Sequence, residues 1–557
     1  MNISNVIQIL ISELHVTEIL SLFLVFLILS VGSYFNGFVI LESIKVFNKK
    51  FRNPIRDYHF SIYLLTGLLS SIFILQIIYL FIPVSNEFWK ISFLLGVLIL
   101  SWKRYKHKTF ITITKFHYLS ITSALLLLIN STTESTYYDL GLYYIPLSSW
   151  VEQFPVIPGL ANFHGRFAFS PQHIILATSM NDVFNAISGF TVLTGFISFL
   201  VIILNTRLLG EALRLKNTFA IILSIGIYFV LVFLYSGKNA QTFLTSSSSD
   251  SLVIILLIAI LILITNYFLS DETELLYISF FTALTMFGLR LHSLPISIFI
   301  FTLIILRSKC TRNNVLLILI SSLIVTLPNI LIRTIYSGYP LYPLSFIRIN
   351  FNFAVPVEYT KNESASIVNA GVGSFNFYFS NIIGTLNGNQ IRILITISLF
   401  ITTFCACMLF LLRRKDLTVY LLFYFITLPI FFSWIFVPDP RFILFIVIAH
   451  TIIVLSYLLW ISPLSSLTND KLAVVTLIGI QFLIYLTLIS ALPPNPVKSS
   501  EDKLISIDYY NDKMGNIIYF NNLSDQCWNI QIPCTPGDYT NRFYFNKNNF
   551  MSGISPG

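Results

Sequence analysis

Long apolar runs dominate the chain, and short polar connections separate them. A membrane-spanning helix needs about 20 mostly apolar residues. By this measure we find fourteen candidate spans, or twelve to thirteen if the short or closely spaced runs near residues 96, 282 and 299 do not all span. The centres lie near residues 30, 71, 96, 120, 190, 226, 260, 282, 299, 324, 402, 427, 451 and 481. The pattern predicts an all-α polytopic membrane protein.

Polar connections divide these runs into groups. The parts are an N-terminal amphipathic segment (1–18), spans 1–4 (19–129), a loop with the candidate active site (130–171), spans 5–10 (172–335), a second loop (336–390), spans 11–14 (391–492) and a small C-terminal extramembrane unit (493–557). Within the last part, ISIDYY and NIIYF have the composition of short strands. The chain therefore combines a helical membrane part with two long loops and a small tail unit.

Composition agrees with a membrane protein. Of the 557 residues, 55% are hydrophobic and only 11% are charged, and the mean hydropathy is +0.79. A soluble globular protein has about 25% charged residues. The formal net charge is +9, but basic residues of membrane proteins gather in cytoplasmic loops. The positive charge therefore does not indicate a nucleic-acid partner.

Basic residues are concentrated in most of the alternate connections, although 270–274 has none and 463–471 has only Lys471. If the N-terminus lies outside, the cytoplasmic connections include 42–58, 102–109 and 307–314, and more than half of the 34 Lys and Arg residues become cytoplasmic. This asymmetry follows the positive-inside rule. Both termini and all long hydrophilic connections are then expected on the outer face.

Two cysteines in the tail fit this orientation. Cys527 and Cys534 occur in CWNIQIPC, and an oxidising compartment would allow them to form a disulfide. The alternative is two independent free thiols.

The loop 130–171 carries the best candidate for catalysis. Asp139 lies in TYYDLGLYY, before a predicted interfacial helix in LSSWVEQF. A carboxylate near the headgroup layer loses part of its hydration, which raises its pKa and makes it a better general base. We expect Asp139 to act in this way. The alternative is a helix N-cap or a solvated loop acid.

The second half of the same loop carries a candidate phosphate site. In ANFHGRFAFSP, His164 and Arg166 flank Gly165, which permits a tight turn. An Arg offers two parallel donors to a phosphate, and a His adds another. The alternative is that Arg166 reaches toward lipid headgroups without binding a substrate.

Two weaker candidate groups are expected on the same face. GLRLHSLP places Arg290 and His292 at the end of a span, where an ionisable residue is a functional candidate. VPDPRF places Asp439 and Arg441 in a turn with two prolines. There, a local Asp–Arg pair that rigidifies the turn is the stronger interpretation, and Arg441 remains a weaker phosphate candidate. No Walker, zinc or dinucleotide-binding motif is present in the sequence.

The loop also resembles a known group of sequences. YYDLGLYYIPLSSWVEQFPVIPGLANFHGRFAFSP is similar to a family of uncharacterised bacterial polytopic membrane proteins, whose members read Y-D-x-G-L-Y-H, then V-x-P-G-L-x-N-L-H-G-R and F-N-S. The resemblance extends to VPDPRF and to DQCWNIQIPCTP, and so spans most of the chain. Asn162 in this motif joins the candidate substrate-binding residues. Position 144 is Tyr, where the family motif has His.

More distantly, the architecture resembles the GT-C class of membrane glycosyltransferases. In those enzymes many spans surround an outward cavity, an acidic residue lies in the first large external loop, and the sugar donor is a polyprenyl-phosphate lipid. The resemblance implies that Asp139 is the catalytic carboxylate. This chain departs from the pattern in two ways: its acidic loop follows the fourth span, and Tyr138 precedes Asp139 where many members have an acidic pair.

Together these features predict a glycosyltransferase-like enzyme at the outer leaflet of the bacterial cytoplasmic membrane. Its partners would be a lipid-linked sugar donor, a glycan or lipid acceptor and membrane lipid, in the assembly of cell-surface polysaccharide or glycoconjugate. The residues establish no cofactor and leave a divalent metal open. The alternatives are a flippase for lipid-linked oligosaccharide and an oligosaccharide polymerase. The spans are poor in ionisable groups, which favours an enzyme over a flippase with a charged central path.

Overall fold

The computed structural model describes most of the first two thirds of the chain and parts of its C-terminal unit. The described residues are 16–47, 59–107, 137–169, 171–184, 188–234, 244–307, 312–366, 507–512, 516–528, 530–536, 543–545 and 553–556, with single positions 123, 127, 131, 135, 369 and 449. Several predictions lie outside them: most of the N-terminal amphipathic segment, most of the span near 120, the four spans from 402 to 481, and Asp439 and Arg441.

The described part is mostly helical, and five of its helices are long and apolar enough to cross a membrane. These are α2 (Val16–Phe47), α3 (His59–Tyr79), α9 (Gly189–Arg214), α12 (Ser249–Ser270) and α15 (Arg312–Ser337). Three shorter apolar helices accompany them, namely α10 (Thr218–Leu234), α13 (Thr273–Leu289) and α14 (Leu294–Arg307), together with α4 (Glu87–His107), which has charged residues at both ends. Helices of this kind indicate a multi-pass membrane protein, as the hydropathy pattern predicts.

Small residues allow the first two helices to approach closely. A Cβ atom on Gly37 of α2 would lie 1.9 Å from the Tyr63 carbonyl oxygen, and one on Gly67 of α3 would lie 1.7 Å from the Ser33 carbonyl oxygen. Only glycine fits at such a backbone contact, which is a common packing device between membrane helices. Nearby, the Asn36 side-chain amide donates to Ser71 Oγ at 2.9 Å and adds a polar contact between α2 and α3.

The predicted span centred near residue 190 is wrong in position. The chain there forms a short helix, α8 (Pro171–Ser179), then a turn, and the long helix α9 begins only at Gly189. The turn contains Asp182 in a left-handed conformation (φ 52°). Asn181 Oδ1 accepts from the Gly189 backbone N–H at 2.7 Å, and Ser188 caps the new helix. These polar caps start a second helix inside an otherwise apolar run.

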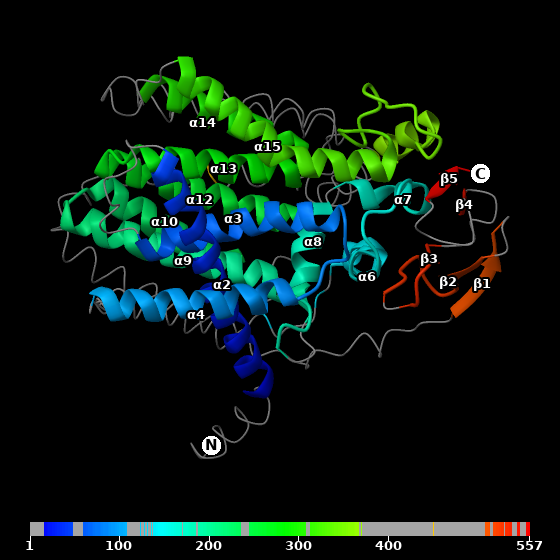
Figure 1. Ribbon diagram of the computed structural model, residues 1–557, viewed down its shortest axis with the longest axis horizontal. Coiled ribbons are helices and arrows are strands. Elements are labelled where there is room, and N and C mark those ends of the chain that lie inside the picture. Colours follow the sequence, from blue (N-terminus) through cyan, green and yellow to red (C-terminus); the bar gives the residue numbers. More distant parts are fainter. Residues whose placement is uncertain are drawn as a thin grey trace, which may run out of the picture.

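Short elements gather at one end of the bundle, which we call the site end (Figure 1). They are the π-helix η2 (Leu140–Tyr144), α6 (Ile145–Gln153), α7 (Leu160–Phe163), the 3₁₀ turn η3 (Gly165–Ala168) and α8. A further 3₁₀ turn, η4 (Leu291–Ser293), joins α13 to α14. Backbone bonds connect this region to the long helices: Val156 N–H donates to Tyr79 O of α3 at 3.1 Å, and Gly159 N–H to Ile335 O of α15 at 2.8 Å.

The C-terminal unit contains short strands, in agreement with the two strands that the sequence predicts. β1 (Ile507–Asn511) pairs antiparallel with β2 (Ile517–Asn521), and β2 pairs parallel with β3 (Cys534–Thr535). A second pair is formed by β4 (Phe543–Phe545) and β5 (Ile554–Pro556). These strands lie beside α6 and α7 at the site end (Figure 1).

Candidate functional site

The Asp139 carboxylate lies at the start of η2 and contacts three side chains. Its Oδ1 accepts from Arg166 Nη1 at 3.0 Å, and its Oδ2 accepts from the hydroxyls of Tyr137 at 3.2 Å and Tyr143 at 3.4 Å. Asp139 precedes η2 in the chain, but its side chain makes no capping hydrogen bond. It is 15% exposed. The carboxylate therefore faces a cluster of polar side chains, which the N-cap alternative does not explain.

Arg166 lies between two carboxylates. Besides Asp139, its Nε atom contacts Glu363 Oε1 at 3.4 Å, and its guanidinium lies 5.7 Å from the centre of the Tyr143 ring. A guanidinium has five N–H donors, and within the described residues no hydrogen bond uses Nη2. The side chain is 30% exposed. One edge of the guanidinium is thus left for a further anion.

Charges around Arg166 keep it cationic. Burial alone would lower its pKa, but electrostatic interactions with Tyr143, Asp139 and Glu363 outweigh burial, and the pKa is raised above its ordinary value. At physiological pH only the two carboxylates among these carry a negative charge. Burial, and secondly the negative charge of Asp139, also raise the pKa of Tyr143 well above its ordinary value. The Tyr143 hydroxyl therefore stays protonated and can donate to Asp139 at any physiological pH.

Glu363 is a site residue that sequence reasoning missed. It lies in EYTKNESASI, a polar stretch of the loop 336–390 without a motif that would single it out. The same segment explains Gly165: a Cβ atom there would lie 2.9 Å from the Tyr342 hydroxyl oxygen and 3.5 Å from Glu363 Oε2. Glycine lets the second loop approach the first.

His164 supports the turn that presents Arg166. Its Nδ1 atom accepts from the Arg166 backbone N–H at 3.2 Å, which caps η3. Its ring stacks on Phe167, with ring centres 5.1 Å apart, and lies 5.9 Å from the Tyr143 ring. The predicted phosphate ligand thus lies beside the cluster and also organises its backbone.

A second ion pair lies within electrostatic reach of Tyr143 and Tyr144. Arg290 at the end of α13 contacts Asp250 in the first turn of α12, with Nη2 and Oδ1 2.8 Å apart and side chains only 18% and 7% exposed. Tyr144 is affected by both pairs: burial raises its pKa, the charge of Asp139 raises it further, and the charge of Arg290 lowers it. Tyr144 therefore lies within electrostatic reach of Asp139 and Arg290. His292 follows in η4.

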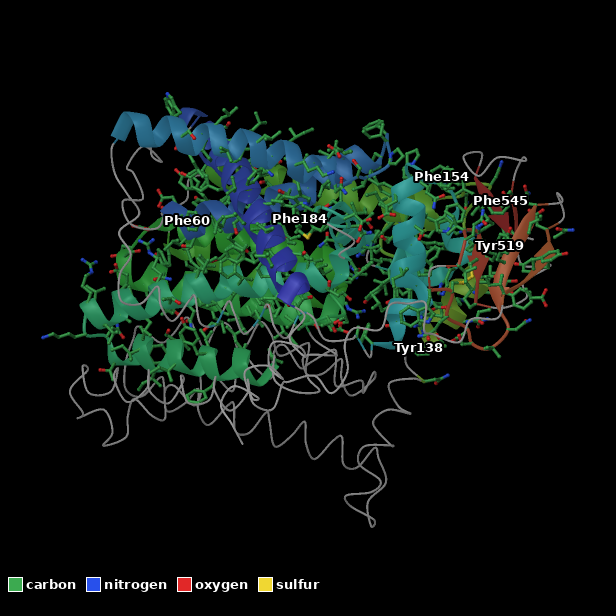
Figure 2. The ribbon with its side chains drawn as sticks, turned by 90° about the horizontal axis from the view of Figure 1, so that it is seen from below. Phe60, Tyr138, Phe154, Phe184, Tyr519 and Phe545 are labelled. Atoms are coloured by element: carbon green, nitrogen blue, oxygen red, sulfur yellow. A yellow bond between two sulfur atoms is a disulfide. The ribbon has the colours of Figure 1, made fainter. Side chains whose placement is uncertain are left out.

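The C-terminal unit packs directly on this loop. The Trp528 ring covers Gly141, where a Cβ atom would lie 2.2 Å from the ring, and the Trp528 backbone N–H donates to Gly141 O at 3.1 Å. Tyr138 donates to Asp525, and the Gln526 amide donates to Tyr138 O at 2.7 Å. Figure 2 shows Tyr138 at the same end of the molecule as Tyr519 and Phe545, away from Phe60.

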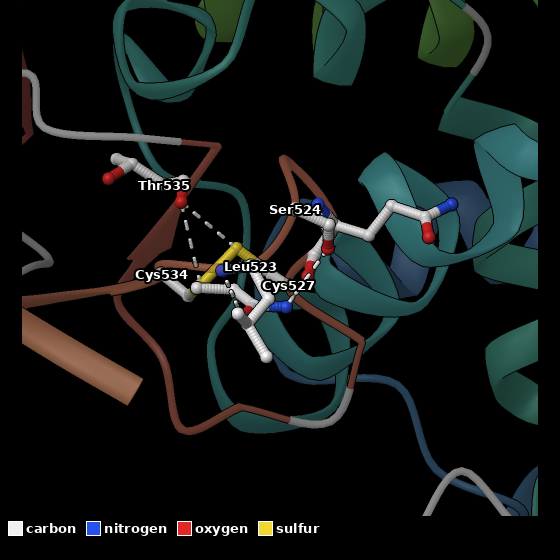
Figure 3. The surroundings of a disulfide bond; sticks show 7 residues. Leu523, Ser524, Cys527, Cys534 and Thr535 are labelled. Carbon is white, nitrogen blue, oxygen red and sulfur yellow. Dashed lines mark hydrogen bonds between the residues drawn. A yellow bond between two sulfur atoms is a disulfide. The ribbon is translucent and has the colours of Figure 1, made fainter. Parts of the chain in front are cut away.

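Cys527 and Cys534 form a disulfide with an S–S distance of 2.10 Å (Figure 3). It closes the loop that carries Trp528. Both sulfur atoms lie near the Thr535 carbonyl oxygen in β3. The disulfide therefore braces the segment that covers η2.

Asn162 joins three segments. Its side-chain amide nitrogen lies near the carbonyl oxygens of Gly159 at 3.2 Å, Phe353 at 2.7 Å and Ile554 at 3.1 Å. These come from the first loop, the second loop and β5. Such contacts give Asn162 a role in joining these segments, and substrate binding by Asn162 stays a prediction.

The structure thus brings together Asp139, His164, Gly165 and Arg166. The Arg290–Asp250 pair lies within electrostatic reach of Tyr143 and Tyr144, which adjoin this cluster. Asp250 was also missed, although Ser248 and Asp250 form a recognisable helix start. In the part of the chain that the structure describes, no three His, Cys, Asp or Glu side chains gather as a metal site.

Comparison with known proteins identifies the family. Residues 19–448 match the family described as Domain of unknown function (DUF8201), and the chain belongs to it. No curated protein and no solved structure matches the chain.

Proposed function

We propose that this protein is a membrane glycosyltransferase-like enzyme that uses a polyprenyl-phosphate-linked sugar in cell-surface polysaccharide or glycoconjugate assembly. The observation that carries the proposal is the cluster of Asp139, Arg166 and Glu363 at the site end. A partly exposed carboxylate adjoins a cation whose Nη2 atom makes no hydrogen bond to the described residues, and both lie beside long apolar helices. Transfer of a sugar from a lipid-linked phosphate to a hydroxyl needs a base and a phosphate-binding cation near the membrane surface.

The roles follow from the chemistry of each group. Arg166 Nη2 would bind an oxygen of the donor phosphate, because a guanidinium forms strong charge-assisted hydrogen bonds with phosphate. Asp139 would accept the proton of the acceptor hydroxyl as that oxygen attacks the anomeric carbon and the lipid phosphate leaves. The tyrosine hydroxyls on Oδ2 orient the carboxylate. The sugar is thereby joined to the acceptor, and the proton passes to Asp139.

Replacement of the carboxylate tests this assignment. Cells that lack the protein would be complemented with the wild type, Asp139→Asn or Asp271→Asn, and their lipid-linked saccharides compared by mass spectrometry. Asp271 is a suitable control because it caps the opposite end of α12 in a left-handed conformation, which Asn also adopts readily. We expect Asp139→Asn to accumulate the same lipid-linked saccharide as the empty vector, with normal amounts of protein in the membrane. Wild-type levels in that variant would refute the proposal.

The side of the membrane on which the saccharide accumulates separates the enzyme from a flippase. If the protein transfers sugar at the outer leaflet, the unused lipid-linked saccharide should be accessible to an impermeant glycan-modifying reagent in intact cells. Accumulation only on the cytoplasmic side would instead support a flippase for lipid-linked oligosaccharide. If the protein were a polymerase, its loss would leave single repeat units on the surface in place of long chains.

A further inference from the structure

A buried arginine lies away from the Asp139 cluster. Arg333 of α15 is 1% exposed, and its Nη2 atom donates to the Gly288 carbonyl oxygen of α13 at 2.6 Å. Among the described residues no carboxylate forms an ion pair with Arg333, and its Nε atom has no hydrogen-bond partner. This cation is therefore enclosed without a balancing charge there.

Such a charge is costly to bury. An ionised side chain away from water needs compensation from an opposite charge and from hydrogen bonds. The end of α13 offers about half a negative charge. Arg290 lies within electrostatic reach of Arg333, and its partner Asp250 balances only one of these two cations. The group formed by these three side chains thus carries one excess positive charge, which favours an anion.

Arg333 lines a hollow between α3, α8, α13 and α15. Polar side chains share its wall with Arg333, namely Gln76, Gln172, Thr285 and Asn329. Asn329 donates to Gln172 Oε1 at 2.9 Å, and Gln172 donates to the Thr285 carbonyl oxygen at 2.8 Å. The hollow has about 430 Å³ of empty volume, including open space at its mouth. Its enclosed part suits a small polar group and excludes a whole saccharide.

The depth of Arg333 fits a lipid headgroup. It lies four residues before the end of the candidate span Ile318–Ser337, which corresponds to about 6 Å along a helix. A phosphate at the membrane boundary is within reach of a side chain at that depth. We propose that the Arg333 hollow binds the phosphate group of a lipid, as a site separate from Arg166.

Two kinds of lipid could supply this phosphate group, a bulk phospholipid and a polyprenyl phosphate. The proposal does not depend on the transfer reaction, since either lipid supplies the anion. The hollow nevertheless adjoins the candidate site: Gln172 belongs to α8, directly after the first loop, and Gly288 lies two residues before Arg290. A lipid phosphate held there would anchor a chain next to the Asp139 cluster.

Native mass spectrometry of the purified full-length protein in detergent tests the proposal, because it measures which lipids the protein retains. The probes are a polyprenyl phosphate, the same polyprenol without phosphate, phosphatidylglycerol and inorganic phosphate. We expect the phosphorylated polyprenol to be retained at least about tenfold better than the alcohol, since hydrogen bonds to charged groups contribute at least this much. Equal retention of phosphatidylglycerol would assign the phosphate to bulk lipid, and a preference for polyprenyl phosphate would assign it to the carrier.

Two variants locate the binding. Arg333→Met removes the charge at similar length, and Asn329→Asp places a carboxylate one helical turn from Arg333, where it can neutralise the cation. In an Arg166→Met background, which removes the other proposed phosphate site, both should abolish the preference for the phosphorylated lipid, and the second serves if the first fails to fold. Arg214→Met in the same background, at an exposed position on α9, should keep it. An unchanged preference in Asn329→Asp, no preference in the wild type, or binding of inorganic phosphate alone would overturn the proposal.

Discussion

Arg166 is the residue on which the candidate site depends, because it links carboxylates from two distant loops. Asp139 and Arg166 are 27 positions apart, but Glu363 is 197 positions from Arg166. The sequence singles out the first two because they are polar residues in an aromatic loop between apolar runs. Glu363 carries no such signal, because it lies in an ordinary polar stretch. Arg333 carries a different one, since a single charge in a long apolar helix is a functional candidate. Only folding shows their neighbours.

The carboxylates of Asp139 and Glu363 should differ in their contribution to activity. In Glu363→Gln an oxygen remains that can accept from Arg166 Nε, so we expect the consumption of lipid-linked saccharide in isolated membranes to fall only by about tenfold, in line with the loss of one charge-assisted hydrogen bond. Asp139→Asn should abolish it. If Glu363→Gln were inactive and Asp139→Asn retained substantial activity, Glu363 would be the base.

Asn162 should contribute to stability. Asn162→Ala removes a buried amide that contacts three carbonyl oxygens, and unsatisfied buried groups cost about 1–3 kcal/mol each. We expect a lower thermal unfolding temperature for the purified protein. Normal stability together with a loss of saccharide turnover would instead support substrate binding by Asn162.

Among the elements, the docking of the C-terminal unit on η2 was not predictable from sequence. The strands β1 and β2 and the interfacial helix α6 are visible as local patterns, because period and composition report local structure. The contact between Trp528 and Gly141 joins positions that are almost 400 residues apart and leaves no local trace. The break between α8 and α9 was missed for a related reason: a few polar capping residues decide it inside an apolar run.

The packing of Trp528 on Gly141 can be tested by adding one methyl group. In Gly141→Ala the new Cβ would lie 2.2 Å from the Trp528 ring, so the tail must move, at a cost of about 1–3 kcal/mol. We expect faster proteolytic cleavage of the C-terminal unit. The clash requires the ring, so in a Trp528→Ala background the same substitution should have little further effect. Additive effects of the two substitutions would contradict this explanation.

For the whole molecule, hydropathy predicts most of the described helices well, because burial in lipid requires long apolar segments. The centres predicted for α2, α3, α4, α10, α12, α13, α14 and α15 lie within the helices observed. The orientation of the chain in the membrane is inferred from charge asymmetry alone. This orientation determines whether the Asp139 cluster faces the outer leaflet.

Thiol labelling tests the orientation. Leu523→Cys in the tail and Leu215→Cys at the end of α9 introduce exposed positions, with 59% and 47% of the native side chains exposed. In a background with Cys310, Cys405 and Cys407 replaced by Ser, an impermeant thiol reagent should label Leu523→Cys in intact cells. Leu215→Cys should react only after permeabilisation. The reverse pattern would place the site end in the cytoplasm.

The most direct test of the central claim is a structure of the full-length Asp139→Asn protein with the lipid-linked saccharide that accumulates in cells expressing it. The account predicts that the donor phosphate lies within hydrogen-bonding distance of Arg166 Nη2 and that the reacting sugar lies against residue 139. A saccharide bound elsewhere, with Arg166 still held only by its two carboxylate neighbours, would contradict it.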